Sequence, residues 1–136
     1  MQALQAAGQA IPPPQNGRFL VDTGASGTVV DPVLIAALGL TPKNFTPVAS
    51  PTTGPPAAGQ PLPLRPVYDV QLILIPSVTP RSVQLGPSGM MPHMRALSVI
   101  GTHMRHQGID GLIGRDVLEN MVFVYNGNTG TYTLAW

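Results

Sequence analysis

The most regular pattern of apolar and polar positions lies at the C-terminal end of the chain. From Thr131 to Trp136, aromatic and aliphatic side chains alternate with threonine and alanine. A period of two is typical of a strand with one face against a core. Met121 to Tyr125 forms a second β-rich run, and an Asn-Gly-Asn-Thr-Gly segment separates the two. Because tight turns favour these residues, we expect a β-hairpin here.

Shorter patterns predict the other elements. The runs from Arg18 to Asp22 and from Val67 to Ile75 are β-rich. One short helix is expected between Asp31 and Gly39, because aspartate suits the N-cap, the following proline suits the first helical position, and glycine suits the residue after the last turn. Asp116 to Asn120 is expected to form one further helical turn.

Proline and glycine interrupt almost every stretch that is long enough for a helix. The chain has 136 residues, of which 16 are Pro and 15 are Gly. Ser50 to Pro66 is the expected place for a mobile excursion, and Ser77 to Pro92 is a second irregular stretch. A domain boundary within Ser50 to Pro66 would leave two halves that are each too small for a core. The sequence therefore predicts one domain, residues 1–136, of the all-β class, a compact barrel or sandwich with one or two short helices.

Composition and charge exclude several classes of function. Charged residues make up 10% of the chain and the formal net charge is +1, with the basic residues scattered singly. No basic stripe could neutralise phosphates or anionic lipid, so we expect no nucleic acid and no membrane as partners. The absence of cysteine excludes disulfides and thiolate chemistry. Met1 to Ile11 is too polar for a signal peptide, so the protein is expected to be cytoplasmic or a piece of a longer chain.

One segment combines a buried strand with a carboxylate. Phe19, Leu20 and Val21 lead into Asp22, and a Thr-Gly-Ala-Ser-Gly turn follows at once. A desolvated carboxylate is costly unless it accepts hydrogen bonds. The turn could supply them from the N–H groups of Gly24 and Ala25 and from the Thr23 hydroxyl.

A second segment strengthens this interpretation. Leu112, Ile113 and Gly114 form an apolar-apolar-Gly run before a helical turn, and Val99 to Gly101 fits the same short pattern. Together with the Asp22 turn, the run at Leu112 resembles the retropepsin-like aspartic proteases, the single-domain relatives of retroviral proteases. The resemblance implies a small closed barrel-like fold with one or two short helices, dimeric, and an aspartic endopeptidase activity that needs no cofactor and no metal.

The resemblance also implies roles for individual residues. In an aspartic protease two carboxylates activate a water that attacks the peptide bond. The chain has one Asp-Thr-Gly, and no other acid lies in a comparable turn, so the second carboxylate would be Asp22 of another copy in a homodimer. The substrate would be a peptide or protein. The implied site comprises catalytic Asp22, supporting Thr23, Gly24, Leu112, Ile113 and Gly114, and substrate-binding Ala25, Ser26, Thr53 and Gly54, the last two in a flap.

The sequence departs from the family pattern at Ser26, where retroviral members have an acidic partner for the arginine after the apolar-apolar-Gly run. Arg115 is present, and Asp31 is a candidate partner for it. The alternative function is a catalytically weak dimerisation or peptide-binding module of the same fold. A serine nucleophile at Ser26 and a metal site at His103 and His106 are disfavoured. The methionines at 90, 91, 94 and 104 are expected in core or interface packing.

Overall fold

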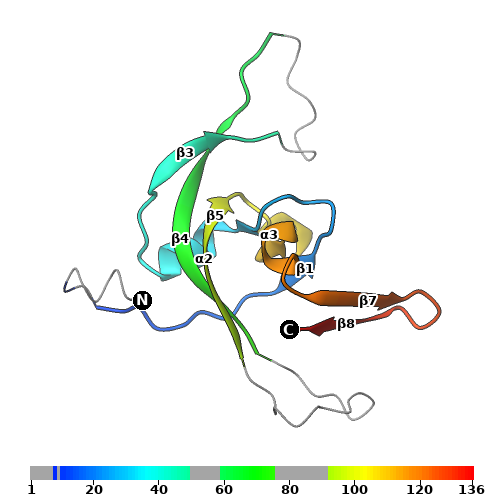
Figure 1. Cartoon of the computed structure of the whole chain (residues 1–136). Helices are drawn as coiled ribbons and strands as arrows, with labels where there is room; N and C mark the ends of the chain where they lie inside the picture. Colours follow the sequence, from blue (N-terminus) through cyan, green and yellow to red (C-terminus); the bar gives the residue numbers. More distant parts are fainter. Residues whose placement is uncertain (1–7, 9, 50–58, 76–91) are drawn as a thin grey trace.

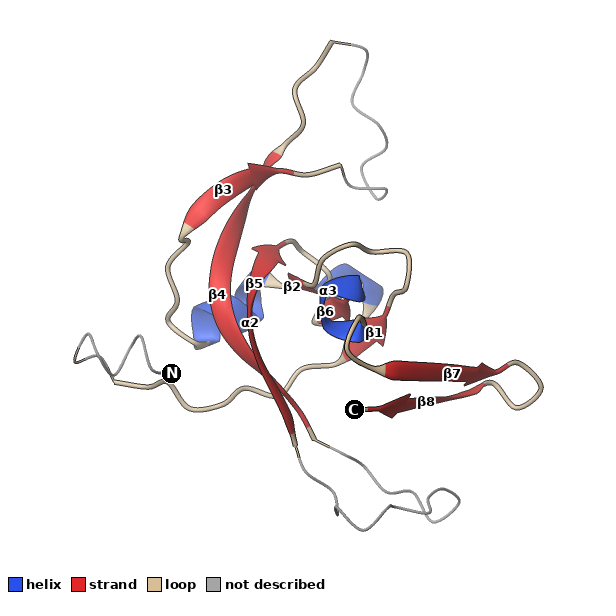
Figure 2. Ribbon diagram, viewed as in Figure 1, coloured by secondary structure: helices blue, strands red, loops and turns tan. Residues whose placement is uncertain are grey.

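The computed structural model describes residues 8, 10–49, 59–75 and 92–136, which contain eight strands, two short α-helices and one 3-10 turn. The chain is mostly β, with few and short helices (Figure 2). In order, the elements are β1 (Phe19–Val21), β2 (Val29–Val30), α2 (Pro32–Ala37), β3 (Asn44–Pro47), β4 (Leu64–Leu74), β5 (His93–Gly101), η1 (Arg105–Gln107), β6 (Gly111–Ile113), α3 (Arg115–Leu118), β7 (Val122–Asn126) and β8 (Thr131–Ala135).

Six strands form one sheet in the order β1-β6-β2-β5-β4-β3, and β7 and β8 form a separate two-stranded sheet. β4 and β5 are the longest strands and are antiparallel, and they cross the centre of the molecule (Figure 1). At the other end of the sheet, β6 lies between β1, to which it is parallel, and β2, to which it is antiparallel. The short strands β1, β6 and β2 are therefore neighbours at the end of the sheet where the chain leaves β1.

The core lies between the sheet and α2. Its buried side chains come from β2, α2, β4 and β5, and Phe19 of β1 packs against them. Ile35 of α2 and Val99 of β5 are almost completely buried, with exposed fractions of 2% and 1%. Burying such aliphatic side chains contributes about 1.5–3 kcal/mol each. This core supports the sheet beside the short strands β1, β2 and β6.

Helix α2 begins and ends close to the residues that the sequence indicated. The carboxylate of Asp31 accepts a hydrogen bond from the Val33 N–H, and Pro32 occupies the first turn. After Leu38 the chain turns at Gly39, which has a φ of 64°. The predicted helical turn near Asp116 is also present as α3, although it starts one residue earlier, at Arg115.

The predicted strands and the C-terminal hairpin are confirmed, but one irregular stretch is partly wrong. Leu64 to Pro66, placed in an irregular segment by the sequence, belongs to β4, because Arg65 and Pro66 pair with β3. The first nine residues of that segment, 50–58, and residues 77–91 of the second irregular stretch lie outside the described residues.

The closed barrel is not seen in the described residues. Closing the sheet would require its two outer strands, β1 and β3, to pair with each other, and they lie at opposite ends of the strand order. The β7–β8 hairpin projects to one side and does not join the sheet (Figure 1). No helix in the described ranges is long and apolar enough to cross a membrane.

Candidate active site

Asp22 is the first residue after β1, and its position is fixed by β6. β1 and β6 pair in parallel, with Leu20 opposite Leu112 and Val21 opposite Ile113. The Asp22 N–H continues this pairing by donating to the Ile113 carbonyl at 3.0 Å. The sheet therefore delivers Asp22 directly beside Gly114, where β6 ends.

The turn after Asp22 directs two N–H groups at one oxygen of its carboxylate. The N–H groups of Gly24 and Ala25 donate to Asp22 Oδ1 at 2.8 and 3.3 Å. These two donors match the sequence prediction. The predicted third donor is wrong, because the Thr23 side chain is exposed and makes no hydrogen bond to any described residue. Hydrogen bonds of this kind stabilise the ionised form of a carboxylate.

The other oxygen of Asp22 is differently placed. Among the described residues, Oδ2 has no hydrogen-bond partner, and Asp22 as a whole is half-buried. A carboxylate with one oxygen held and one oxygen open can bind a water or a substrate group. At Gly24 a Cβ would lie 3.1 Å from Oδ1, so glycine leaves room around the oxygen that accepts the two hydrogen bonds.

Gly114 allows β6 to contact the Asp22 loop closely. A Cβ on Gly114 would lie 2.5 Å from the backbone carbon of Gly27 and 2.6 Å from its oxygen, which no real side chain tolerates. Ile113 is 3% exposed, and Leu112 is half-buried. The structure therefore brings Leu112, Ile113 and Gly114 beside the loop. Val99 to Gly101, the other match to the pattern, lies in β5, which is separated from β1 by both β6 and β2.

A hydrogen-bond network behind the loop escaped the sequence analysis. The hydroxyl of Thr28 donates to Asp116 Oδ1 at 2.7 Å and accepts from the Gly114 N–H at 3.1 Å. The Thr28 N–H donates to Asp116 Oδ2 at 2.9 Å. Thr28 is 1% exposed. The only local sign of this network was an aspartate just after Gly114, in the first turn of α3.

The suggested ion pair between Arg115 and Asp31 is wrong. Asp31 is 1% exposed, and its carboxylate accepts from the N–H groups of Val33, Met104 and Arg105. Burial opposes ionisation, but these hydrogen bonds outweigh it and hold the pKa of Asp31 below its ordinary value. No ion pair within the described part of the chain includes Arg115, whose N–H donates to the Ala25 carbonyl at 2.9 Å.

The remaining candidates differ in their surroundings. Ala25 is half-buried and Ser26 is exposed, both in the loop beside Asp22. Thr53 and Gly54, the flap candidates, lie outside the described residues, as do Met90 and Met91. Met104 is a core residue, as expected, whereas Met94 is 59% exposed. No group of three potential metal ligands occurs in the described ranges.

A comparison with known protein families shows the family of the chain. The family model of aspartyl proteases matches residues 14–117, which is more than half of the 136-residue chain. The chain belongs to the aspartyl protease family. The matched segment includes β1, the Asp22 turn, β6 and most of α3, so it contains the whole arrangement around Asp22. No curated protein and no solved structure gives a significant match to the chain.

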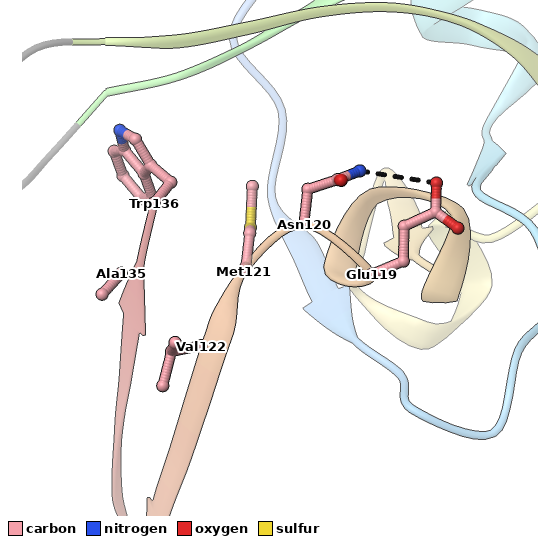
Figure 3. Close-up of a pocket in the computed structure, with 6 residues that line it drawn as sticks. All are labelled: Glu119, Asn120, Met121, Val122, Ala135 and Trp136. Carbon is pink, nitrogen blue, oxygen red and sulfur yellow. Dashed lines mark hydrogen bonds between the residues drawn. The ribbon is translucent and has the colours of Figure 1, made fainter.

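The described surface also has a hollow away from the Asp22 loop. It has a volume of about 450 Å³ and lies between the end of α3 and the β7–β8 hairpin (Figure 3). Its lining consists of Glu119, Asn120, Met121, Val122, Ala135 and Trp136. Asp22 does not line it, and the hairpin follows the segment that the family model matches.

Proposed function

We propose that the chain is an aspartic endopeptidase of the retropepsin type, which hydrolyses peptide bonds with Asp22 as its catalytic residue. The observation that carries the proposal is the state of the Asp22 carboxylate. Two N–H groups bind one oxygen, and no described residue binds the other. Membership of the aspartyl protease family points to the same chemistry. Peptides are therefore the substrate class.

The chemistry needs a second carboxylate close to the first. One carboxylate, ionised, takes a proton from water, and the other, protonated, donates to the scissile carbonyl oxygen. The water oxygen bonds to the carbonyl carbon and gives a tetrahedral diol. The diol then collapses as its C–N bond breaks and the leaving nitrogen gains a proton. Both carboxylates must be within hydrogen-bond reach of the same water.

No other acid of this chain is placed to supply that carboxylate. Each of the five is engaged elsewhere: Asp31 by N–H groups, Asp69 by Lys43 and Ser98, Asp110 by Arg18 and Arg105, Asp116 by Thr28, and Glu119 by Arg95. The proposed second carboxylate is therefore Asp22 of another copy. A two-fold axis would then relate two identical loops, with the exposed Thr23 side chains beside it.

The β7–β8 hairpin is the proposed contact between the two copies. It pairs with no other described strand, and Val122, Val124, Tyr125, Tyr132 and Trp136 are 45–63% exposed. Apolar and aromatic side chains at this exposure are typical of an interface core. Strand addition between two hairpins would bury them and would satisfy the edges of β7 and β8.

The substrate would lie across the two Asp22 loops. We propose that Ala25 and Ser26 contact its backbone, and that Thr53 and Gly54 cover it from the flap. Leu112, Ile113 and Gly114 would support the loops without contacting substrate. We also propose apolar substrate side chains on either side of the cleaved bond, as the resemblance to the retropepsin-like proteases implies.

The experiment is cleavage of a peptide library at a series of protein concentrations, with and without pepstatin. Pepstatin-sensitive cleavage is expected, and its rate should rise more steeply than first order at low concentration, because each copy carries half a site. A dimerisation or peptide-binding module would bind peptides but leave them intact. Cleavage that persists in pepstatin would contradict the aspartic mechanism, and full specific activity in a sample that sediments as a monomer would contradict the half-site.

A further inference from the structure

The network of Thr28, Gly114 and Asp116 lies directly behind the Asp22 loop and has no part in the chemistry proposed above. Thr28 and Asp116 are 88 residues apart in the sequence, yet they share two hydrogen bonds. The threonine is almost completely buried, and the aspartate is half-buried. Buried polar groups are costly unless they are bonded, so this network strongly favours one arrangement of the backbone around it.

The hydroxyl of Thr28 is used in both directions. It accepts from the Gly114 N–H and donates to Asp116 Oδ1. Asp116 Oδ1 also accepts from the Val117 N–H, and Oδ2 accepts from the Thr28 N–H. Both oxygens of the Asp116 carboxylate thus act as acceptors. The Thr28 hydroxyl connects this carboxylate to the N–H of Gly114, the residue after β6.

The same segment contacts the loop at its start and its middle. The Ile113 carbonyl accepts from the Asp22 N–H at 3.0 Å, and the Arg115 N–H donates to the Ala25 carbonyl at 2.9 Å. Thr28 closes the loop at its far end. The seven residues from Asp22 to Thr28 are therefore held at three points by the four residues from Ile113 to Asp116.

We propose that Thr28 and Asp116 are positioning residues for Asp22, an inference that rests on the proposed function. Neither side chain touches Asp22. They fix the end of the loop, and the loop in turn directs the Gly24 and Ala25 N–H groups at Oδ1. Without the Thr28 hydroxyl, the Gly114 N–H and Asp116 Oδ1 each lose a partner, and the loop loses its fixed end.

The test replaces Thr28 by valine, which has nearly the same shape without the hydroxyl, and by serine, which retains it. For Thr28→Val we expect kcat for peptide cleavage to fall about 100-fold, because displacement of a catalytic group by about 1 Å costs this much. KM should change little. Thr28→Ser should recover most of the activity. Asp116→Asn, which keeps the shape of the side chain, should lower kcat in the same direction and provides a second variant if valine prevents folding.

A pH profile separates positioning from simple loss of folded protein. Weaker N–H bonds to Asp22 Oδ1 disfavour the ionised form, so the acidic limb of the profile should move to higher pH in Thr28→Val. A smaller amount of active protein would lower the whole curve without moving it. The matched control is Thr41→Val, which removes a hydroxyl from an exposed loop residue and should leave the profile unchanged.

Amide hydrogen exchange tests the positioning role of Thr28 without relying on peptide cleavage. In Thr28→Val the Gly24, Ala25 and Gly114 amides should exchange at least 10-fold faster, while those of β4 and β5 keep their protection. This readout needs no activity, so it decides the inference even if the parent cleaves nothing and the proposed function fails. Unchanged exchange at Gly24 and Ala25, or an unchanged kcat in a folded Thr28→Val protein, would overturn it.

Discussion

At the scale of single residues, the chemistry depends on what surrounds the Asp22 carboxylate. Its held oxygen faces the N–H groups of Gly24 and Ala25, and the side chain of Ala25 offers nothing further. A pair of such carboxylates shares one proton, and the pH range of activity belongs to the pair. We expect a bell-shaped profile with an optimum near about pH 4–6.

The Ala25→Ser substitution tests this view of the loop. A hydroxyl next to the carboxylate would donate to it and favour its ionised form, so the profile should move to lower pH. Rates of peptide cleavage across pH measure the shift. Ala36→Ser, an exposed position on α2, is the matched control and should leave the profile in place. A shift toward alkaline pH in Ala25→Ser, or a parent optimum near about pH 2, would be incompatible with this role of Ala25.

Residues whose partners are local could be predicted from the sequence, and those with distant partners could not. Gly24 and Ala25 lie within three residues of Asp22, so the turn sequence already indicated their hydrogen bonds. The predicted hydrogen bond from the Thr23 hydroxyl to the Asp22 carboxylate is absent, because that side chain is exposed. Thr28 meets Asp116 only through the pairing of β2 with β6, and no local pattern marks such a contact.

At the scale of elements, α2 illustrates how a strong local signal gains a tertiary function. Asp31 caps the helix through Val33, and the same carboxylate accepts from Met104 and Arg105, just before and at the start of η1. The backbone N–H of Asp31 donates to the carbonyl of Asp110, which is the residue just before β6. The aspartate therefore joins the helix to the segment that leads into the strand behind Asp22.

Asp31→Asn should lower the free energy of unfolding by about 1–3 kcal/mol near neutral pH, because an amide cannot accept all three bonds. The folded protein lowers the pKa of Asp31, so its contribution is complete above the ordinary value of 3.8 and is lost as pH falls through the lower folded value. Urea denaturation at several pH values should thus show parent and variant converging in acid. Asp69→Asn, at an exposed carboxylate, should cost less. A difference that grows in acid would refute the argument.

Strands that are short, or that lack a regular apolar pattern, could not be predicted from the sequence. β6 has three residues and β2 has two, which is too few for any period. In β5, every second residue from His93 onward is the less exposed one. The first two of these residues, His93 and Arg95, are polar, so the apolar positions of this pattern start only at Leu97. β5 is a strand because eight of its residues pair with β4. By contrast, the β7–β8 hairpin has a local turn and a regular alternation, and it was predicted correctly.

At the scale of the whole molecule, the described chain is an open sheet with an attached hairpin. A single copy presents one Asp22, and its other five acids are bound elsewhere. The exposed apolar side chains of β7 and β8 provide the surface on which a second copy could complete the site. The closed, dimeric form expected from the sequence is not seen in the described residues of this single copy.

In the proposed mechanism, the ionisable carboxyl of Asp22 carries out the reaction. The most direct measurement compares peptide cleavage by the parent and by Asp22→Asn at equal concentration. Asparagine keeps the shape of the side chain and can still accept from Gly24 and Ala25, so the fold should be retained, as checked by circular dichroism. The variant should lose at least about 1000-fold in rate, whereas Asp69→Asn should cleave like the parent. A folded Asp22→Asn protein with near-normal activity would contradict the account.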